Sequence, residues 1–300
     1  MREPLGVLTF TDGMPRAQLD RYVSNVEELG YDGFWIPELM GREPFATAGF
    51  LVARTSRMKI ATGIANIYAR DAVAAAQARQ TLAELSGGRF ILGLGVAHPA
   101  IAELRGHAWT PPARKMREYL DAIARATVQS PGAAEPAPIV IAAHAPKLIA
   151  LAAERADGVH TYLMPPEHTR RTRAALGPAK ALRVVLPFVP ATDPVRARQT
   201  IRQDLAFYMQ FEAYPRMWRT LGFSEADFVD GGSDRLLDSI VGWGDPSRIR
   251  ASIDRHLEAG ATQVLLGVLG SPPDSDAAWE MLVALAPRTD RLAVGRGWRV

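Results

Sequence analysis

Short apolar runs alternate with longer amphipathic stretches along almost the whole chain. Eight of these runs have the length of a strand and the Val, Ile, Leu and Phe content of strands that are buried on both faces. Because each is followed by a stretch with helical periodicity, the pattern predicts eight β/α repeats. The runs are Leu5–Phe10, Gly33–Pro37, Lys59–Ile67, Phe90–Val96, Ile139–His144, Val159–Met164, Arg183–Val189 and Gln263–Leu269.

Eight repeats without a long linker predict an α/β fold, a single-domain (β/α)8 TIM barrel that covers residues 1–300. One connection is much longer than a single helix needs. Residues 193–245 separate the last two runs and are rich in aromatic side chains, so we expect a helical insertion. Its aromatic residues are expected in a core or a dimer interface, or in the wall of a substrate pocket. The active site of such a barrel lies beyond the carboxyl ends of the strands.

Composition narrows the chemistry. The chain has no cysteine, which excludes disulfides, thiolate metal sites and cysteine nucleophiles. The net charge of +3 and the scattered basic residues argue against nucleic-acid binding. No run reaches the length of a membrane span and the N-terminus lacks the apolar core of a signal peptide, so we expect a cytoplasmic protein with no membrane partner. Paired histidines at strand ends are absent from the sequence, and we therefore expect no metal site.

The fourth run, Phe90–Val96, is nearly all apolar and ends abruptly in small and polar residues. Gly93 and Gly95 weaken a strand, so their presence indicates that a ligand or a neighbouring backbone approaches closely. A dinucleotide-binding motif is not supported, because His98 stands where a third glycine would be. His98 follows the strand directly and is a candidate to donate a proton or to hydrogen-bond a cofactor ring; a plain loop or capping role is the alternative.

Several separated segments resemble one family. Lys59–Arg70, Gly88–Gly95, Ile139–Lys147 and Gly244–Ser247 are similar to segments of the bacterial luciferase-like superfamily of flavin- and deazaflavin-dependent oxidoreductases. The resemblance is to the actinobacterial branch that uses coenzyme F420. It implies hydride transfer between F420 and a small organic substrate, with the hard chemistry supplied by the cofactor. It also implies a homodimer.

The resemblance also implies a cofactor site. In this family a cis peptide that matches Gly63-Ile64 backs the cofactor ring, and small residues after the fifth strand let backbone amides contact the cofactor. His144 stands where the family often has glycine. The expected cofactor-binding residues are Glu38, Gly63, Ile64, Asn66, Gly95, His98, Ala143 and His144.

The acid–base group is expected at Glu38 or His98. Many deazaflavin-dependent members carry an acidic residue after the second strand and then a histidine that is a proposed proton carrier. Here Glu38 occupies the acidic position, but Leu39 replaces the histidine. The alternative for Glu38 is a structural role, in which it caps a helix or pairs with an arginine.

Two other functions fit the same motifs. One is an FMN-dependent luciferase-like monooxygenase that receives reduced flavin from a partner reductase. The other is a non-catalytic relative that keeps the cofactor cleft, a possibility that Leu39 raises because the proton carrier is missing there. A fold by itself does not choose between these functions.

Overall fold

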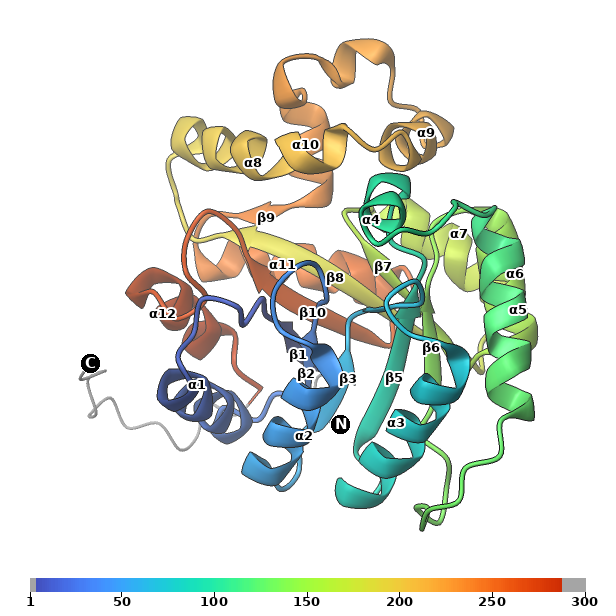
Figure 1. Ribbon diagram of the computed structural model, residues 1–300. Coiled ribbons are helices and arrows are strands. Elements are labelled where there is room, and N and C mark those ends of the chain that lie inside the picture. Colours follow the sequence, from blue (N-terminus) through green and yellow to red (C-terminus); the bar gives the residue numbers. More distant parts are fainter. Residues whose placement is uncertain (1–3, 288–300) are drawn as a thin grey trace.

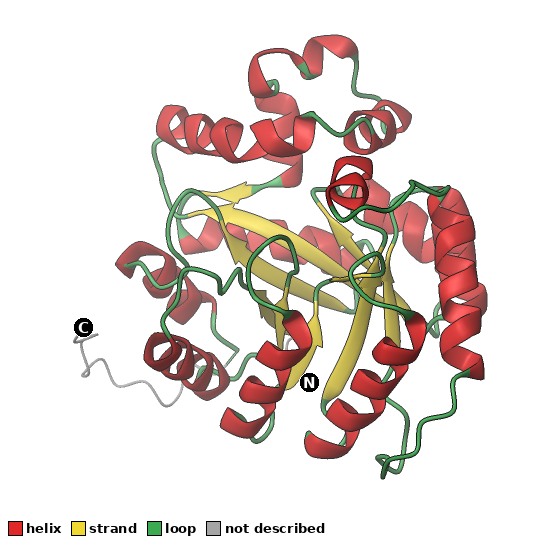
Figure 2. Ribbon diagram, in the orientation of Figure 1, coloured by secondary structure: helices red, strands yellow, loops and turns green. Residues whose placement is uncertain are grey.

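The eight predicted runs form one closed parallel barrel (Figures 1 and 2). The structure is a computed structural model that describes residues 4–287. The strand order is β10-β1-β2-β3-β5-β6-β7-β8, and β8 pairs with β10 to close the sheet. The (β/α)8 fold is confirmed. The strands are β1 (Leu5–Leu8), β2 (Gly33–Ile36), β3 (Lys59–Thr62), β5 (Phe90–Gly95), β6 (Ile139–Ala142), β7 (Gly158–Tyr162), β8 (Ala181–Val189) and β10 (Gln263–Val268).

Helices surround the barrel (Figure 2). Asp71 and Asp245 are the N-caps of two of these helices: their carboxylates accept hydrogen bonds from Ala74 N and Arg248 N. The helices outside the insertion are α1 (Arg16–Glu28), α2 (Pro44–Arg54), α3 (Ala72–Leu85), α4 (Pro99–Leu104), α5 (Pro112–Arg125), α6 (Pro146–Arg155), α7 (Pro166–Leu176), α11 (Pro246–Glu258) and α12 (Asp276–Leu285). The ends of the predicted 1–300 domain, residues 1–3 and 288–300, lie outside the described residues.

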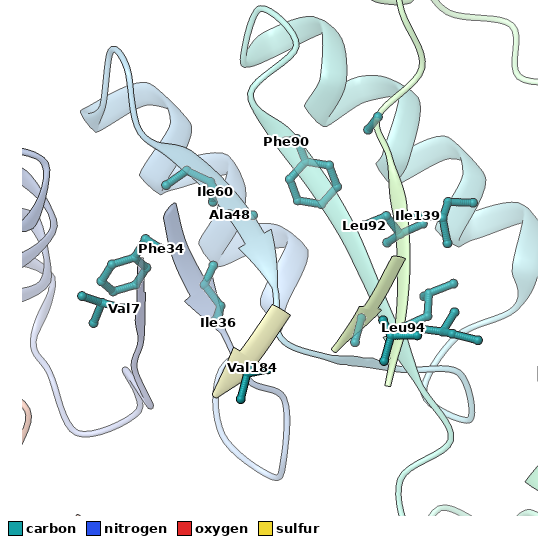
Figure 3. Packing of buried hydrophobic residues seen from close by; sticks show 14 of the residues in the cluster. Val7, Phe34, Ile36, Ala48, Ile60, Phe90, Leu92, Leu94, Ile139 and Val184 are labelled. Atoms are coloured by element: carbon teal, nitrogen blue, oxygen red, sulfur yellow. The ribbon is translucent and has the colours of Figure 1, made fainter. Parts of the chain in front are cut away.

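Successive residues of each strand face two different cores, because side chains alternate across a strand. One set points outward against the helices, and Figure 3 shows part of it, including Phe34, Ile60 and Phe90. The other set fills the barrel interior and includes Trp35, Ala61 and Ile91. Burial on both faces explains why the strands appear in the sequence as continuous apolar runs.

The third predicted run is not one strand. Lys59–Ile67 divides into β3 and a two-residue strand, β4 (Ala65–Asn66), and the peptide bond between Gly63 and Ile64 is cis, as the resemblance implies. The chain bends here while Gly63 N donates to the Ile36 carbonyl at 2.7 Å. The continuous strand was therefore a wrong prediction, since apolar composition does not reveal a bend between two strand segments.

The expected helical insertion between β8 and β10 is present. It contains α8 (Pro194–Met209), α9 (Ala213–Thr220), α10 (Asp234–Ile240), the short turns η1 (Glu225–Asp227) and η2 (Val229–Gly231), and β9 (Gly242–Trp243), which pairs with β8. Figure 1 shows α8, α9 and α10 together beyond one end of the barrel, with α4 close to α9. The insertion has its own apolar core, to which Trp218 contributes, and Trp218 Nε1 donates to the Leu163 carbonyl at 2.9 Å. Within residues 4–287, no helix has the length and apolar character needed to cross a bilayer.

Candidate active site

Gly93 and Gly95 make room for the bend after β3. A Cβ on Gly93 would overlap the Thr62 carbonyl oxygen, and one on Gly95 would lie 2.5 Å from Ile64 Cγ1. The predicted approach of a neighbouring backbone is therefore confirmed for Gly93, whereas the neighbour of Gly95 is an isoleucine side chain. Ile64 is only partly buried. It thus presents an apolar surface at the carboxyl ends of β3 and β5.

Glu38 is held in a buried ion pair. Its two carboxylate oxygens accept bidentate hydrogen bonds from Arg70 Nη1 and Nη2, both at 2.7 Å. The side chains are only 6% and 11% exposed, respectively. Burial opposes the charge on Arg70, but hydrogen bonding and the charge of Glu38 outweigh it and raise the arginine pKa. This is the structural alternative expected for Glu38.

Asn66 belongs to the same network. Its backbone N–H donates to Glu38 Oε2 at 2.7 Å, and its side-chain oxygen accepts from Tyr68 N at 2.9 Å. Asn66 is buried. Glu38, Arg70 and Asn66 together fix the chain just after the bend, while neighbouring Leu39 is exposed and carries no group that can transfer a proton.

His98 lies at the N-terminus of α4 and is covered by the insertion. Its ring stacks on Phe211 with 3.8 Å between centroids and 4° between planes, and Tyr214 lies 6.0 Å away. Burial lowers the pKa of His98 to about 4. Near neutral pH the side chain is a neutral imidazole with one N–H donor and one acceptor nitrogen.

His144 follows β6 and lies on the same side of the barrel mouth. Its Nε2 accepts the Tyr162 N–H at 3.2 Å, so in a neutral ring the proton is on Nδ1. Its ring is 5.5 Å from that of Tyr214. Burial, followed by the neighbouring histidines that include His98, lowers the pKa of His144 to about 3. His98 and His144 are therefore brought together around Tyr214 as two neutral imidazoles.

Ala143 is placed differently from its neighbour. Its backbone N–H donates to the His160 carbonyl at 3.2 Å, and its methyl group is buried in the outer core. A contact between the Ala143 amide and a cofactor would have to replace that hydrogen bond. The role of Ala143 in cofactor binding stays a prediction.

A cavity of about 420 Å³ opens beside these residues. It lies between the carboxyl ends of β1, β8 and β10 and helix α8, and Tyr162 at the end of β7 forms part of its wall. None of the eight predicted cofactor residues lines it. Asp204, Phe207 and Tyr208 of α8 line this cavity together, and no local sequence pattern predicts their grouping. The density of aromatic residues in the insertion was the available indication.

The barrel mouth combines an apolar isoleucine surface, two neutral imidazoles and an adjoining cavity. These features lie beyond the carboxyl ends of the strands, where (β/α)8 barrel enzymes have their active sites. A family model, luciferase-like monooxygenase, matches residues 4–263. The chain belongs to this family of oxidoreductases.

Curated relatives with similar sequences include reductases. The chain is 28% identical to 5,10-methylenetetrahydromethanopterin reductase of Methanolobus tindarius, over 92% of this chain and 97% of the relative. It is 31% identical to a protein of Mycobacterium tuberculosis that is provisionally named a coenzyme F420-dependent oxidoreductase, over 50% of this chain and 52% of the relative.

Solved structures share the fold. The coenzyme F420-dependent tetrahydromethanopterin reductase of Methanopyrus kandleri has a TM-score of 0.72 at 19% identity and covers 95% of this chain and 98% of its own. An F420-dependent secondary alcohol dehydrogenase in complex with an F420-acetone adduct has a TM-score of 0.74 at 15% identity, with 95% and 99% coverage. A type II Baeyer–Villiger monooxygenase of Pseudomonas putida in complex with FMN has a TM-score of 0.68 at 16% identity, with 96% and 99% coverage. At these identities the likeness concerns the fold.

Proposed function

We propose that the protein is a coenzyme F420-dependent oxidoreductase that transfers a hydride between the deazaflavin and a small organic substrate. The observation that carries this proposal is the partly exposed Ile64 surface beside Gly95. His98 follows Gly95 by three residues, and His144 lies close enough to His98 to feel its charge. An apolar surface flanked by neutral hydrogen-bonding groups suits a flat, largely uncharged ring. The relatives named for F420 support the choice of cofactor. The bound deazaflavin supplies the hydride chemistry.

Each residue has a distinct part in this proposal. Ile64 supports the ring, and Gly95 leaves space for the Ile64 side chain. His98 and His144 offer hydrogen bonds as neutral imidazoles. With a pKa of about 4, only roughly one His98 in a thousand is protonated at pH 7, so we assign it a hydrogen bond to the ring or substrate before a proton transfer. Glu38, engaged with Arg70, orders the mouth.

Titration of the purified protein with F420 and with FMN in parallel, followed by cofactor fluorescence, tests the proposal. We expect saturable F420 binding and markedly weaker FMN binding. Ile64→Thr keeps the β-branched shape but places a hydroxyl against the ring, so F420 affinity should fall by roughly tenfold. The matched control is Val73→Thr on α3, an exposed position whose change should leave affinity unaltered. Tight FMN binding with no F420 binding would instead favour the monooxygenase alternative.

Turnover separates the proposal from the non-catalytic alternative. Reduction of bound F420 by any member of a panel of alcohols and amines, or oxidation of reduced F420 by the matching carbonyl compounds, supports the enzyme. A homodimer and a cytoplasmic location remain predictions. Light scattering of the purified protein would test the first and cell fractionation the second.

A further inference from the structure

The cavity beside the mouth has mostly apolar walls. Leu8, Phe10, Phe207 and Val268 contribute to them, from β1, the segment after it, α8 and β10. Its volume of about 420 Å³ is within the usual range for a small-molecule site, roughly 300–1,000 Å³. Phe10 and Phe207 are also exposed, at 41% and 39%, so the apolar surface continues outward.

One charged residue, Asp204, is among the residues that line this cavity. Its Oδ2 accepts the Gly270 N–H at 2.8 Å, which fixes the carboxylate in place. Within the described chain, no lysine or arginine makes an ion pair with it. Other acidic residues of the insertion do have arginine partners: Glu212 and Glu225 with Arg219, Asp227 with Arg235, and Asp234 and Asp238 with Arg198.

The cavity adjoins the region proposed for the cofactor. Tyr162 is one of the residues that line the cavity, and its backbone N–H donates to His144 Nε2. Tyr208 lines the cavity too, and its ring is 5.2 Å from that of Tyr162 and 5.5 Å from that of Tyr214. Tyr162 and Tyr208 therefore separate a molecule in the cavity from His144 and Tyr214.

We propose that this cavity is the substrate site and that it takes a small apolar molecule with a protonated amine directed at Asp204. The assignment as a substrate site rests on the proposed function, whereas the preference for a cation follows from the cavity itself. A fixed carboxylate between apolar walls is stabilised most by an opposite charge, less by a hydroxyl, and is repelled by an anion. The amine anchors the molecule; it need not be the group that reacts.

Binding of three probes of matched size tests the preference without any cofactor. The probes are 2-phenylethylamine, 2-phenylethanol and phenylacetate, titrated by calorimetry at pH 7. We expect the amine to bind roughly tenfold or more tightly than the alcohol, and phenylacetate to bind weakest. Equal affinity for amine and alcohol, or no binding of the amine, would overturn the proposal.

The variant Asp204→Asn tests whether the preference for the amine comes from this carboxylate. Asparagine retains an oxygen that can accept the Gly270 N–H, so the pocket should stay folded and its affinity for 2-phenylethanol should not change. Affinity for the amine should fall roughly 10- to 100-fold. Asp230→Asn is the control, because it removes one charge from an exposed position of the same insertion. Equal losses in the two variants would show a long-range charge effect and sink the assignment. Since no F420 is present, this outcome is independent of the cofactor titrations.

Discussion

At the scale of single residues, Glu38 and Arg70 form a buried ion pair at the barrel mouth. Both side chains are almost fully covered and meet in a two-pronged geometry. Removing Glu38 leaves Arg70 with the half-exposed Glu43 at 3.1 Å, and removing Arg70 leaves Glu38 with Arg105 at 3.8 Å. Neither contact replaces the bidentate one, so breaking the pair costs more than losing the pair as a whole.

We therefore expect Glu38→Gln and Arg70→Met each to lower the free energy of unfolding by about 3–5 kcal/mol, and the double variant to lose less than the sum. Urea denaturation measures all three. Glu118→Gln is the control: its partner Arg114 is 3.8 Å away and both are about two-thirds exposed, so the loss should be below about 1 kcal/mol. Additive losses for Glu38 and Arg70 would contradict the paired role.

Gly93 and Gly95 make different demands on the chain. Alanine at position 95 would press on the Ile64 side chain, whereas alanine at 93 would press on the Thr62 backbone. Only the first conflict can be relieved by another substitution.

Gly95→Ala should destabilise the protein by about 1–3 kcal/mol through overpacking, and adding Ile64→Ala should recover part of that loss. Gly93→Ala should destabilise it as well, with no recovery from Ile64→Ala. Thermal unfolding of the four variants provides the comparison. Recovery in the Gly93 background would show that the two glycines share one cause.

At the scale of elements, the insertion covers the mouth through its aromatic side chains. Phe211, between α8 and α9, stacks on His98 from α4, and Tyr214 of α9 approaches both His98 and His144. The environment of His98 thus depends on a segment more than a hundred residues further along the chain.

Phe211→Ala should raise the pKa of His98 from about 4 toward its ordinary value, by at least about one unit, because water regains access to the ring. NMR titration of the histidine ring protons measures this change. His256, whose Nδ1 is 2.9 Å from Thr169 Oγ1 in a buried site, is the internal reference and should keep its depressed pKa of about 3. A His98 pKa that stays near 4 would mean that Phe211 does not shield it.

At the scale of the whole molecule, buried neutral histidines make the fold sensitive to acid. Burial lowers the pKa to about 4 for His98 and to about 3 for His144, His160 and His256. In the unfolded chain the pKa of each of these histidines is about 6.5. The unfolded state therefore binds more protons between these values, and stability falls as the pH is lowered from about 6.5 toward 3–4.

The melting temperature should thus decrease between about pH 6.5 and pH 5, above the range in which unfolded carboxylates titrate. Calorimetry across this range gives the slope. His256→Gln removes one titrating group, so the slope should be shallower whatever the effect on stability at pH 7.5. A melting temperature that does not change over this range would refute the burial of these histidines as neutral groups.

The pattern of apolar runs alone determined the barrel and the place of the insertion, whereas the bend at Gly63-Ile64 was expected only from the family resemblance. The reason is that burial on both faces forces each strand into a continuous apolar run, and a helix between runs makes the sheet parallel. Helix N-caps also follow from the local sequence, because the capping side chain bonds to the first turn of its own helix. Asp71 and Asp245 each accept the N–H of the residue three positions further along.

Only the tertiary structure decided how distant groups meet. The partner of Glu38 is 32 positions away, and a spacing of that kind carries no local pattern. The stacking of Phe211 on His98 and the cavity between Asp204 and β10 depend on how the insertion folds back over the strand ends. Protonation follows from the same packing, because burial lowers the pKa of a histidine and burial is a property of the assembled molecule.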